Sequence, residues 1–305
     1  MPNPISAWLL IGLAAALPAA AYEVRTIDFP GAADTNLIAV NDRGQFVGTE
    51  QDGSGAVHAI YFDGKSLKLL DATGLLGSSP QSFALSINNR GAIAGTYQGS
   101  DNAFHGFLRE PSGKVDSIDF PGAIDTEAFG VNDFGIVIGV FFDTAGNSHA
   151  FTLQDGRYQL ADLPGGLLTI PFSINDRGQI VGEFVTTPNT TGFGFLEQPD
   201  KHVTFTTAPR SQPQGTSFIS INNRDQVLGT YTDQSGAVQN FVRTGENYAL
   251  FDLPARLGAS GVSAQTINDL GDIVGFYSDG NGVQHGFFAT PSRRETDRNS
   301  DAGSA

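Results

Sequence analysis

One short pattern recurs six times along this chain and constrains its fold more than any other feature. In each copy an apolar residue is followed by Asn, then by Asp or Asn, and a few residues later by an apolar pair that Gly closes. The successive Asn residues are 47, 44, 43, 47 and 46 residues apart: Asn41, Asn88, Asn132, Asn175, Asn222 and Asn268. This period is the one expected of the four-stranded blades of a β-propeller.

The pattern itself predicts a strand, a four-residue turn and a second strand. An Asn side chain at the end of a strand can accept a hydrogen bond from the turn backbone two residues on. The fourth turn position, where a short hairpin needs positive φ, is Gly in every copy except the fifth, which has Asp225. The Gly inside each second strand indicates a bulge or a close backbone approach. We therefore interpret the recurring Asn, Asp and Gly residues as turn formers rather than ligand-binding groups.

Each of the first five repeats holds four predicted strands. In the fourth repeat the first strand ends at Asn175, the second runs from about 179 to 184, the third lies near 192 to 196 and the fourth at 203 to 207. Short turns that contain Gly join the third and fourth strands in other repeats, as in hairpins. Beyond residue 21 there is no helical periodicity, so the predicted fold class is all-β.

The two ends of the chain indicate how the array closes. Residues 24 to 35 (VRTIDFPGAADT) match residues 115 to 126 (VDSIDFPGAIDT), which include a fourth strand, although no repeat precedes residue 24. The sixth repeat has no fourth strand after residues 285 to 290. We therefore predict one six-bladed β-propeller, residues 22 to 290, whose N-terminal strand completes the last blade and removes the exposed sheet edge. A β-solenoid is the alternative, but it gives no reason for the displaced strand.

Residues beside the recurring pattern predict how the innermost strands pack. Those directly before the recurring apolar residue are small, as expected where six strands crowd one axis: Ala39, Ser86, Gly130, Ser173, Ser220 and Thr266. Those one position earlier are mostly apolar, and strand alternation predicts that they pack between blades: Ile38, Leu85, Phe129, Phe172, Ile219 and Gln265. The 23 Phe residues are expected to supply the inter-blade core.

The N-terminal segment, residues 1 to 21, predicts export. Residues 7 to 17 form a short apolar core, Pro18 follows it, and Ala at 19 to 21 offers a small-residue cleavage pattern. We expect a signal peptide and a secreted or periplasmic protein. The segment is too short for a stable membrane span, and no later apolar run approaches the necessary length. Residues 291 to 305 are polar and charged and are expected to be a disordered tail.

Composition excludes several classes of function. The chain has no Cys, which excludes disulfides, cysteine nucleophiles and thiolate metal sites. Its formal net charge of −15 disfavours nucleic acids and anionic membranes as partners, because an acidic surface repels phosphate groups. The only Trp, Trp8, lies in the predicted signal, so an aromatic platform for a sugar would have to be Tyr or Phe. We expect a monomer without a cofactor.

The tripeptide His149-Ala150-Phe151, preceded by Val131-Asn132-Asp133, carries a family resemblance. With these residues the chain resembles the HAF-repeat family of predicted extracellular bacterial proteins, which is named for the tripeptide. Close variants begin at His58, His105 and His285, whereas the fourth and fifth repeats have no His at this position. The resemblance covers nearly all of the chain after the signal. It implies an extracellular address and a repeat architecture, and it implies no activity.

The repeated histidines suggest a metal site, but strand spacing argues against one. Third strands lie roughly 10 Å outboard of the first strands, since adjacent strands are about 4.8 Å apart. Equivalent histidines in neighbouring blades are then too far apart to share a zinc ion, whose bonds are only about 2 Å long, so we expect a structural role within each blade. Asp residues in the loops between second and third strands could bind Ca²⁺ weakly, but the loops lack regularly alternating oxygen ligands: Asp52, Asp101, Asp143, Asp233 and Asp279. No metal is therefore expected.

The loops that join successive blades carry the candidate ligand-binding residues. These loops differ more than the turns at the other face, as expected where function is added to a scaffold. Their charged residues are the candidates: Asp34, Asp125, Glu127, Arg210 and Arg256. No catalytic residue is expected, because no GxSxG, HExxH, phosphate-binding or dinucleotide-binding motif is present.

The sequence thus predicts a secreted, non-catalytic binding or scaffold propeller. The ligand is a small molecule, a glycan or a protein, held at the face that bears the inter-blade loops. The alternative is an extracellular polysaccharide hydrolase or lyase that uses carboxylates such as Asp34 and Asp125 at the channel entrance. A purely structural surface protein without a ligand is the third possibility.

Overall fold

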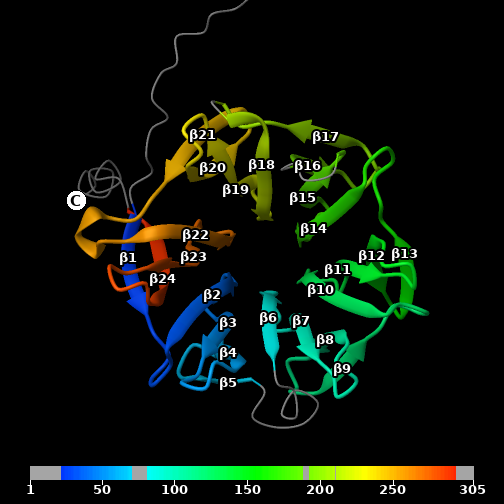
Figure 1. Cartoon of the computed structure of the whole chain (residues 1–305), viewed down its shortest axis with the longest axis horizontal. Coiled ribbons are helices and arrows are strands. Elements are labelled where there is room, and N and C mark those ends of the chain that lie inside the picture. The colour runs from blue at the N-terminus through cyan, green and yellow to red at the C-terminus, as the bar shows by residue number, and fades with distance from the viewer. Residues whose placement is uncertain (1–21, 71–80, 188–191, 210, 293–305) are drawn as a thin grey trace, which may run out of the picture.

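Six antiparallel sheets of four strands surround a common axis like the blades of a wheel (Figure 1). The computed structural model describes residues 22–70, 81–187, 192–209 and 211–292. Within these residues there are 24 strands and the short 3₁₀ helix η2 (Ala255–Leu257). The prediction of a six-bladed, four-stranded propeller is confirmed, and the solenoid alternative is wrong.

Each blade places its first strand nearest the axis and its fourth strand at the rim (Figure 1). Blade 1 is β2 (Asp34–Val40), β3 (Phe46–Gln51), β4 (Val57–Phe62) and β5 (Leu67–Leu69), and blade 2 is β6 (Ser82–Ile87), β7 (Ile93–Gln98), β8 (Phe104–Arg109) and β9 (Val115–Ile118). Blade 3 is β10 (Asp125–Val131), β11 (Val137–Phe142), β12 (Ser148–Gln154) and β13 (Arg157–Leu160). Blade 4 is β14 (Leu168–Ile174), β15 (Ile180–Val185), β16 (Phe193–Glu197) and β17 (Val203–Thr206).

The last two blades show how the wheel closes. Blade 5 is β18 (Ser211–Ile221), β19 (Gln226–Asp233), β20 (Val238–Thr244) and β21 (Asn247–Phe251), and blade 6 contains β22 (Ser260–Ile267), β23 (Ile273–Ser278) and β24 (Gln284–Pro291). Its fourth strand is β1 (Tyr22–Ile27), which pairs with β24 from Tyr22 opposite Pro291 to Ile27 opposite Gly286. The N-terminal strand therefore completes the sixth blade, as predicted.

A β-bulge in every first strand overturns one packing prediction. The register skips one residue in each blade, for example between Leu37 and Ala39, and the skipped residues are those predicted to pack between blades: Ile38, Leu85, Phe129, Phe172, Ile219 and Gln265. Because a bulge interrupts strand alternation, these side chains line the axis instead. The second-strand Gly stands opposite the bulge. A Cβ on Gly139, for example, would overlap the carbonyl oxygen of Glu127, which explains why the repeat has Gly there.

The core lies between neighbouring blades. Six Phe side chains are at most 1% exposed: Phe107, Phe151, Phe195, Phe218, Phe241 and Phe287. Phe218 of blade 5, for example, packs in one cluster with Val181 of blade 4 and Phe241 of its own blade. Burial of each such ring stabilises the fold by about 1.5–3 kcal/mol. The prediction that Phe forms the inter-blade core is confirmed for these residues.

The predicted signal peptide lies outside the described residues, as does the predicted tail beyond residue 292. Pro291, which the sequence places in the tail, belongs to β24. None of the described helices is long and apolar enough to cross a membrane.

Candidate functional site

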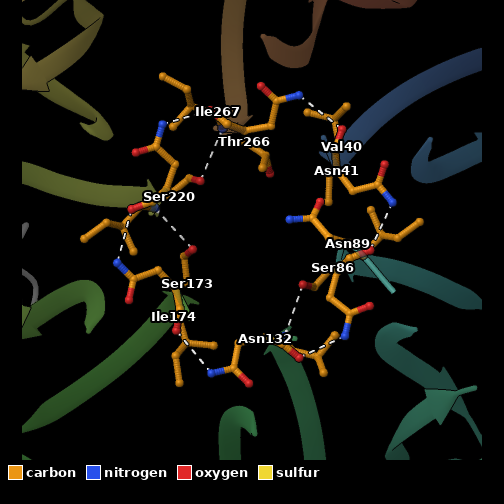
Figure 2. Close-up of a pocket in the computed structure, with 18 of the residues that line it drawn as sticks. Val40, Asn41, Ser86, Asn89, Asn132, Ser173, Ile174, Ser220, Thr266 and Ile267 are labelled. Carbon is orange, nitrogen blue, oxygen red and sulfur yellow. Dashed lines mark hydrogen bonds between the residues drawn. The ribbon is translucent and has the colours of Figure 1, made fainter. Parts of the chain in front are cut away.

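A cavity of about 320 Å³ lies on the axis of the wheel. All six blades line it with the last residues of their first strands and the first residues of the turns that follow (Figure 2). Residues at equivalent positions form successive levels along the axis. In order, these are the bulge residues, the small residues, the recurring apolar residues, an Asn level and an Asp/Asn level.

The Asn level is a closed ring of hydrogen bonds. Each side-chain Nδ2 donates to the backbone oxygen of the Asn in the next blade, with N···O distances of 2.8–3.1 Å: Asn41 to Asn88, Asn88 to Asn132, Asn132 to Asn175, Asn175 to Asn222, Asn222 to Asn268, and Asn268 to Asn41 (Figure 2). Each side-chain Oδ1 accepts backbone N–H groups of its own turn, as at Arg43 and Gln45 for Asn41. These Asn residues form the turns, as predicted, and they also join the blades.

The next residues of the turns form a second ring. Each backbone N–H donates to Oδ1 of the corresponding residue in the following blade, with N···O distances of 2.6–2.8 Å: Asp42 to Asn89, Asn89 to Asp133, Asp133 to Asp176, Asp176 to Asn223, Asn223 to Asp269, and Asp269 to Asp42. Four carboxylates are therefore held around one end of the cavity. The recurring Asp and Asn residues are inter-blade fasteners as well as turn residues.

The carboxylate ring is electrostatically unfavourable at neutral pH. Burial raises the pKa of Asp42, and the nearby carboxylate of Asp269 raises it further. Burial likewise raises the pKa of Asp133, together with the charge of Asp176. Side-chain amides offset part of this cost, since Asn89 donates to Asp42 at 2.7 Å. Hydrogen-bond acceptors thus face a partly desolvated space.

The level formed by the bulge residues differs from blade to blade. Phe129 and Phe172, from blades 3 and 4, form an aromatic pair with ring centroids 6.3 Å apart and planes tilted by 36°. Blades 1, 2 and 5 contribute Ile38, Leu85 and Ile219, and blade 6 contributes the amide of Gln265. Because Phe129 and Phe172 are half-buried, their faces are partly available inside the cavity. Blades 3 and 4 therefore supply an aromatic wall that the other blades lack.

Four of the five candidate residues predicted from the inter-blade loops lie in the described part of the chain, and they do not line this cavity: Asp34, Asp125, Glu127 and Arg256. Oδ1 of Asp34 accepts the backbone N–H of Gln284 at 2.7 Å, and Oδ1 of Asp125 accepts that of Phe104 at 2.7 Å. Both carboxylates therefore tie the start of a first strand to the third strand of the preceding blade. Arg256, in η2, donates to the carbonyl oxygen of Val24 at 3.5 Å. Arg210 lies outside the described residues.

Glu127 differs from the other candidates because its carboxyl group is partly buried beside another acid. Burial raises the pKa of Glu127, and the charge of Asp125 adds to the shift. The two residues are on the same strand, β10. The structure thus brings Asp125 and Glu127 together, whereas Asp34 lies in blade 1 and Arg256 lies in the connection to blade 6. Ligand binding by these residues stays a prediction.

The repeated histidines are held by carboxylates within the blade and its loops. Nδ1 of His149 lies 2.8 Å from Asp162 and its Nε2 lies 3.4 Å from Asp143. Two further histidines have the same arrangement, His105 between Asp119 and Asp101, and His285 between Asp28 and Asp279. Hydrogen bonding to Asp162 raises the pKa of His149. In the described part of the chain, no group of three or more His, Asp or Glu residues could hold a metal ion.

Loop aspartates that could have suggested calcium binding cap their own turns. Oδ1 of Asp52 accepts the backbone N–H groups of Ser54 and Ala56 at 2.8 and 3.1 Å. Asp143 accepts those of Ala145 and Asn147, both at 2.8 Å. These carboxylates therefore have a local structural use, and hydrogen bonding, chiefly from Ser54, lowers the pKa of Asp52 to about 2.

No family model matches this sequence, and no curated protein matches it. Several solved structures are similar. A mutant Aleuria aurantia lectin in complex with α-methyl-L-fucoside is 13% identical with a TM-score of 0.51, over 87% of this chain and 93% of the lectin. AofleA from Arthrobotrys oligospora is 12% identical with a TM-score of 0.53, over 90% and 91%. TolB from Acinetobacter baumannii is 10% identical with a TM-score of 0.52, over 81% of this chain and 63% of TolB. At such low identity the likeness shows a shared β-propeller fold alone.

Proposed function

We propose that this protein is a non-catalytic carbohydrate-binding propeller that takes a saccharide unit in the axial cavity. The observation that carries the proposal is the combination of an aromatic pair, Phe129 and Phe172, with rings of polar side chains in one cavity of about 320 Å³. This volume lies near the lower end of the range of about 300–1,000 Å³ found for small-molecule sites.

The chemistry of the walls suits a sugar ring. A sugar has apolar C–H faces that pack on aromatic rings, and hydroxyl groups that both donate and accept hydrogen bonds. Phe129 and Phe172 supply the aromatic surface. Ser173 and Ser220 supply hydroxyl groups, and the carboxylate ring supplies hydrogen-bond acceptors at the other end of the cavity. The lectins with a similar fold bind fucosides by their titles, which supports a sugar as the class of ligand. Export, expected from residues 1 to 21, and the HAF-repeat resemblance are consistent with an extracellular glycan.

A glycan array of the purified protein, followed by calorimetric titration of the best ligands, tests this function. We expect Phe129→Ala to weaken binding about 2- to 10-fold, because an aromatic contact contributes about 0.5–1.5 kcal/mol. Leu85→Ala is the matched control, since Leu85 occupies the same level in blade 2. Absence of any glycan ligand, or equal losses in the two variants, would refute the proposal.

A second candidate function, a polysaccharide hydrolase or lyase, is favoured by Glu127. Its raised pKa suits a general acid, and Asp125 lies two residues away on the same strand, which places the two Cα atoms roughly 7 Å apart. Glycosidases use paired carboxyl groups that lie about 5–9.5 Å apart. The hydrogen bond from Phe104 to Asp125 is a competing structural use. Release of reducing ends from polysaccharides by the native protein, abolished in Glu127→Gln, would establish this function in place of simple binding.

A further inference from the structure

A second cavity, of about 540 Å³, lies between blades 3 and 4. Its walls include Thr152 and Gln154 of β12 and Gln159 of β13, and Pro199 and Lys201 on the blade 4 side. We propose that this inter-blade groove is a separate binding site for a neutral saccharide unit. The choice of a saccharide rests on the proposed function, whereas the existence of the groove does not.

The groove lies where blade 3 has a smaller or more polar residue than the other blades have. Thr152 pairs with Ile138, the residue before the second-strand Gly, and faces the next blade. The residues at this register position in the other blades are Tyr61, Leu108, Leu196, Val242 and Phe288. Four of these are larger than Thr, and Val242 is of similar size but has no hydroxyl group; Leu196 for example packs against the core cluster of the following blade. Thr152 leaves the corresponding space open.

The walls of the groove combine an apolar floor with hydrogen-bonding groups. Ile136, Ile174 and Ile180 supply apolar surface for the C–H face of a sugar. Thr152, Gln154 and Gln159 supply a hydroxyl and two amides, which donate and accept hydrogen bonds as sugar hydroxyls do. A pocket lined by apolar groups with a few convergent polar groups is the usual form of a small-molecule site.

The charges of the groove indicate a neutral rather than an ionic ligand. Nζ of Lys201 lies 2.7 Å from Oε1 of Glu197, a buried carboxylate that this cation compensates. The remaining charged residues are Arg157 and Asp155, of opposite sign, two residues apart. An Arg and an Asp can together bind adjacent hydroxyl groups, the first as donor and the second as acceptor. Because the positive and negative groups of the groove balance, a ligand without net charge is favoured.

Filling the groove tests the proposal. Thr152→Leu introduces the residue that blades 2 and 4 carry at this position, so we expect the fold to be kept and the melting temperature to be equal or higher. The probe is a neutral oligosaccharide identified on the glycan array. Calorimetric titration should give two saccharide sites for the native chain and one for Thr152→Leu, whereas Thr152→Ser, which keeps the groove and its hydroxyl, should still give two.

Ile174 lines both the axial cavity and the groove, so a test must distinguish the two sites. Phe129→Ala does so, because Phe129 lines only the axial cavity. A Thr152→Leu variant that binds as many saccharides as the native chain overturns the groove alone, and the Phe129→Ala result then stands for the axial cavity. Failure of every saccharide to bind overturns both. Binding in the groove should be unchanged when NaCl rises from about 0.05 to about 0.5 M, because no ion pair is formed. A steep loss with salt, or a preference for charged saccharides, overturns the assignment of a neutral ligand.

Discussion

The hydrogen-bonded rings at the axis and the cavity walls that blades 3 and 4 supply are built in opposite ways. In the rings, the turns of all six blades contribute Asn or Asp residues in the same bonds, so that two rings of hydrogen bonds close without a break. In blades 3 and 4, by contrast, Phe129 and Phe172 in the axial cavity and Thr152 in the inter-blade groove depart from the residues that most other blades have at the same positions. The repeated residues hold the scaffold together, and the departures supply surfaces on which a ligand could be selected.

Opening the wheel should produce the largest effect on the symmetric region. Deletion of residues 22 to 27 removes β1 together with the buried side chain of Val24, and it leaves six residues of β24 without their strand partners. We expect the variant to aggregate and to lose its cooperative unfolding transition. The wheel is no longer closed, which weakens both hydrogen-bonded rings, and an unpaired strand edge is exposed. Thermal melting followed by circular dichroism measures this, with deletion of residues 293 to 305 as the control. A deletion variant that melts like the native protein would contradict the role of closure.

Breaking one ring should cost stability without a specific effect on binding. Asn175→Ala removes donors to Asn222 and Gln179 and the acceptor of two turn N–H groups, all buried or nearly so. We expect a loss of about 3 kcal/mol in the free energy of unfolding, since unsatisfied buried groups cost about 1–3 kcal/mol each. Urea unfolding measures the loss. Phe172→Ala, in the same blade, should lower stability less and saccharide affinity more; the reverse order would break the comparison.

Replacing the histidines should have the smallest effect, visible only as pH dependence. Burial lowers the pKa of His105 and His285, but the flanking carboxylates outweigh it and raise both, and they raise the pKa of His149 as well. A His pKa that is higher in the folded state than in the unfolded state means that protonation of the ring stabilises the fold. This stabilisation is fully present below about pH 6.5 and is lost as the pH rises through the folded-state pKa. Both ring nitrogens face carboxylates, and only the charged ring can donate from both.

The variant that replaces these three histidines with Gln should therefore melt with less dependence on pH between about 6 and 8 than the native protein. Melting curves across this range, at constant ionic strength, supply the comparison. Curves of equal slope for the two proteins would show that the histidines do not stabilise the charged form.

The propeller architecture could be predicted because it depends on local turn chemistry and on the two chain ends, one of which has an extra strand and the other of which lacks one. The Gly turns have positive φ, including 69° at Gly44, and Asp225 has φ of 60° in the copy without Gly. The strand at 24 to 29 could be assigned to the last blade from its match with residues 115 to 120 and from the missing fourth strand of the sixth repeat. These signals need no knowledge of distant contacts.

The candidate site was less accessible, for two physical reasons. Oδ1 of each recurring Asn has a partner in its own turn, which sequence reasoning found, whereas the partner of Nδ2 lies in the next blade and follows only from the closed ring. Strict strand alternation also predicts that Phe129 and Phe172 pack between blades. The bulges at these residues turn both side chains toward the axis instead. Thr152 could have been found by aligning the third strands, where Thr stands among Tyr, Leu, Leu, Val and Phe.

The central claim, that departures from the repeat supply the binding surface, is tested most directly by two double variants at one level of the cavity. Saccharide affinity should fall about tenfold or more in Phe129→Ala/Phe172→Ala, which removes two aromatic contacts, and stay within about threefold in Leu85→Ala/Ile219→Ala. Equal losses in the two variants, or a larger loss in the aliphatic pair, would contradict the account.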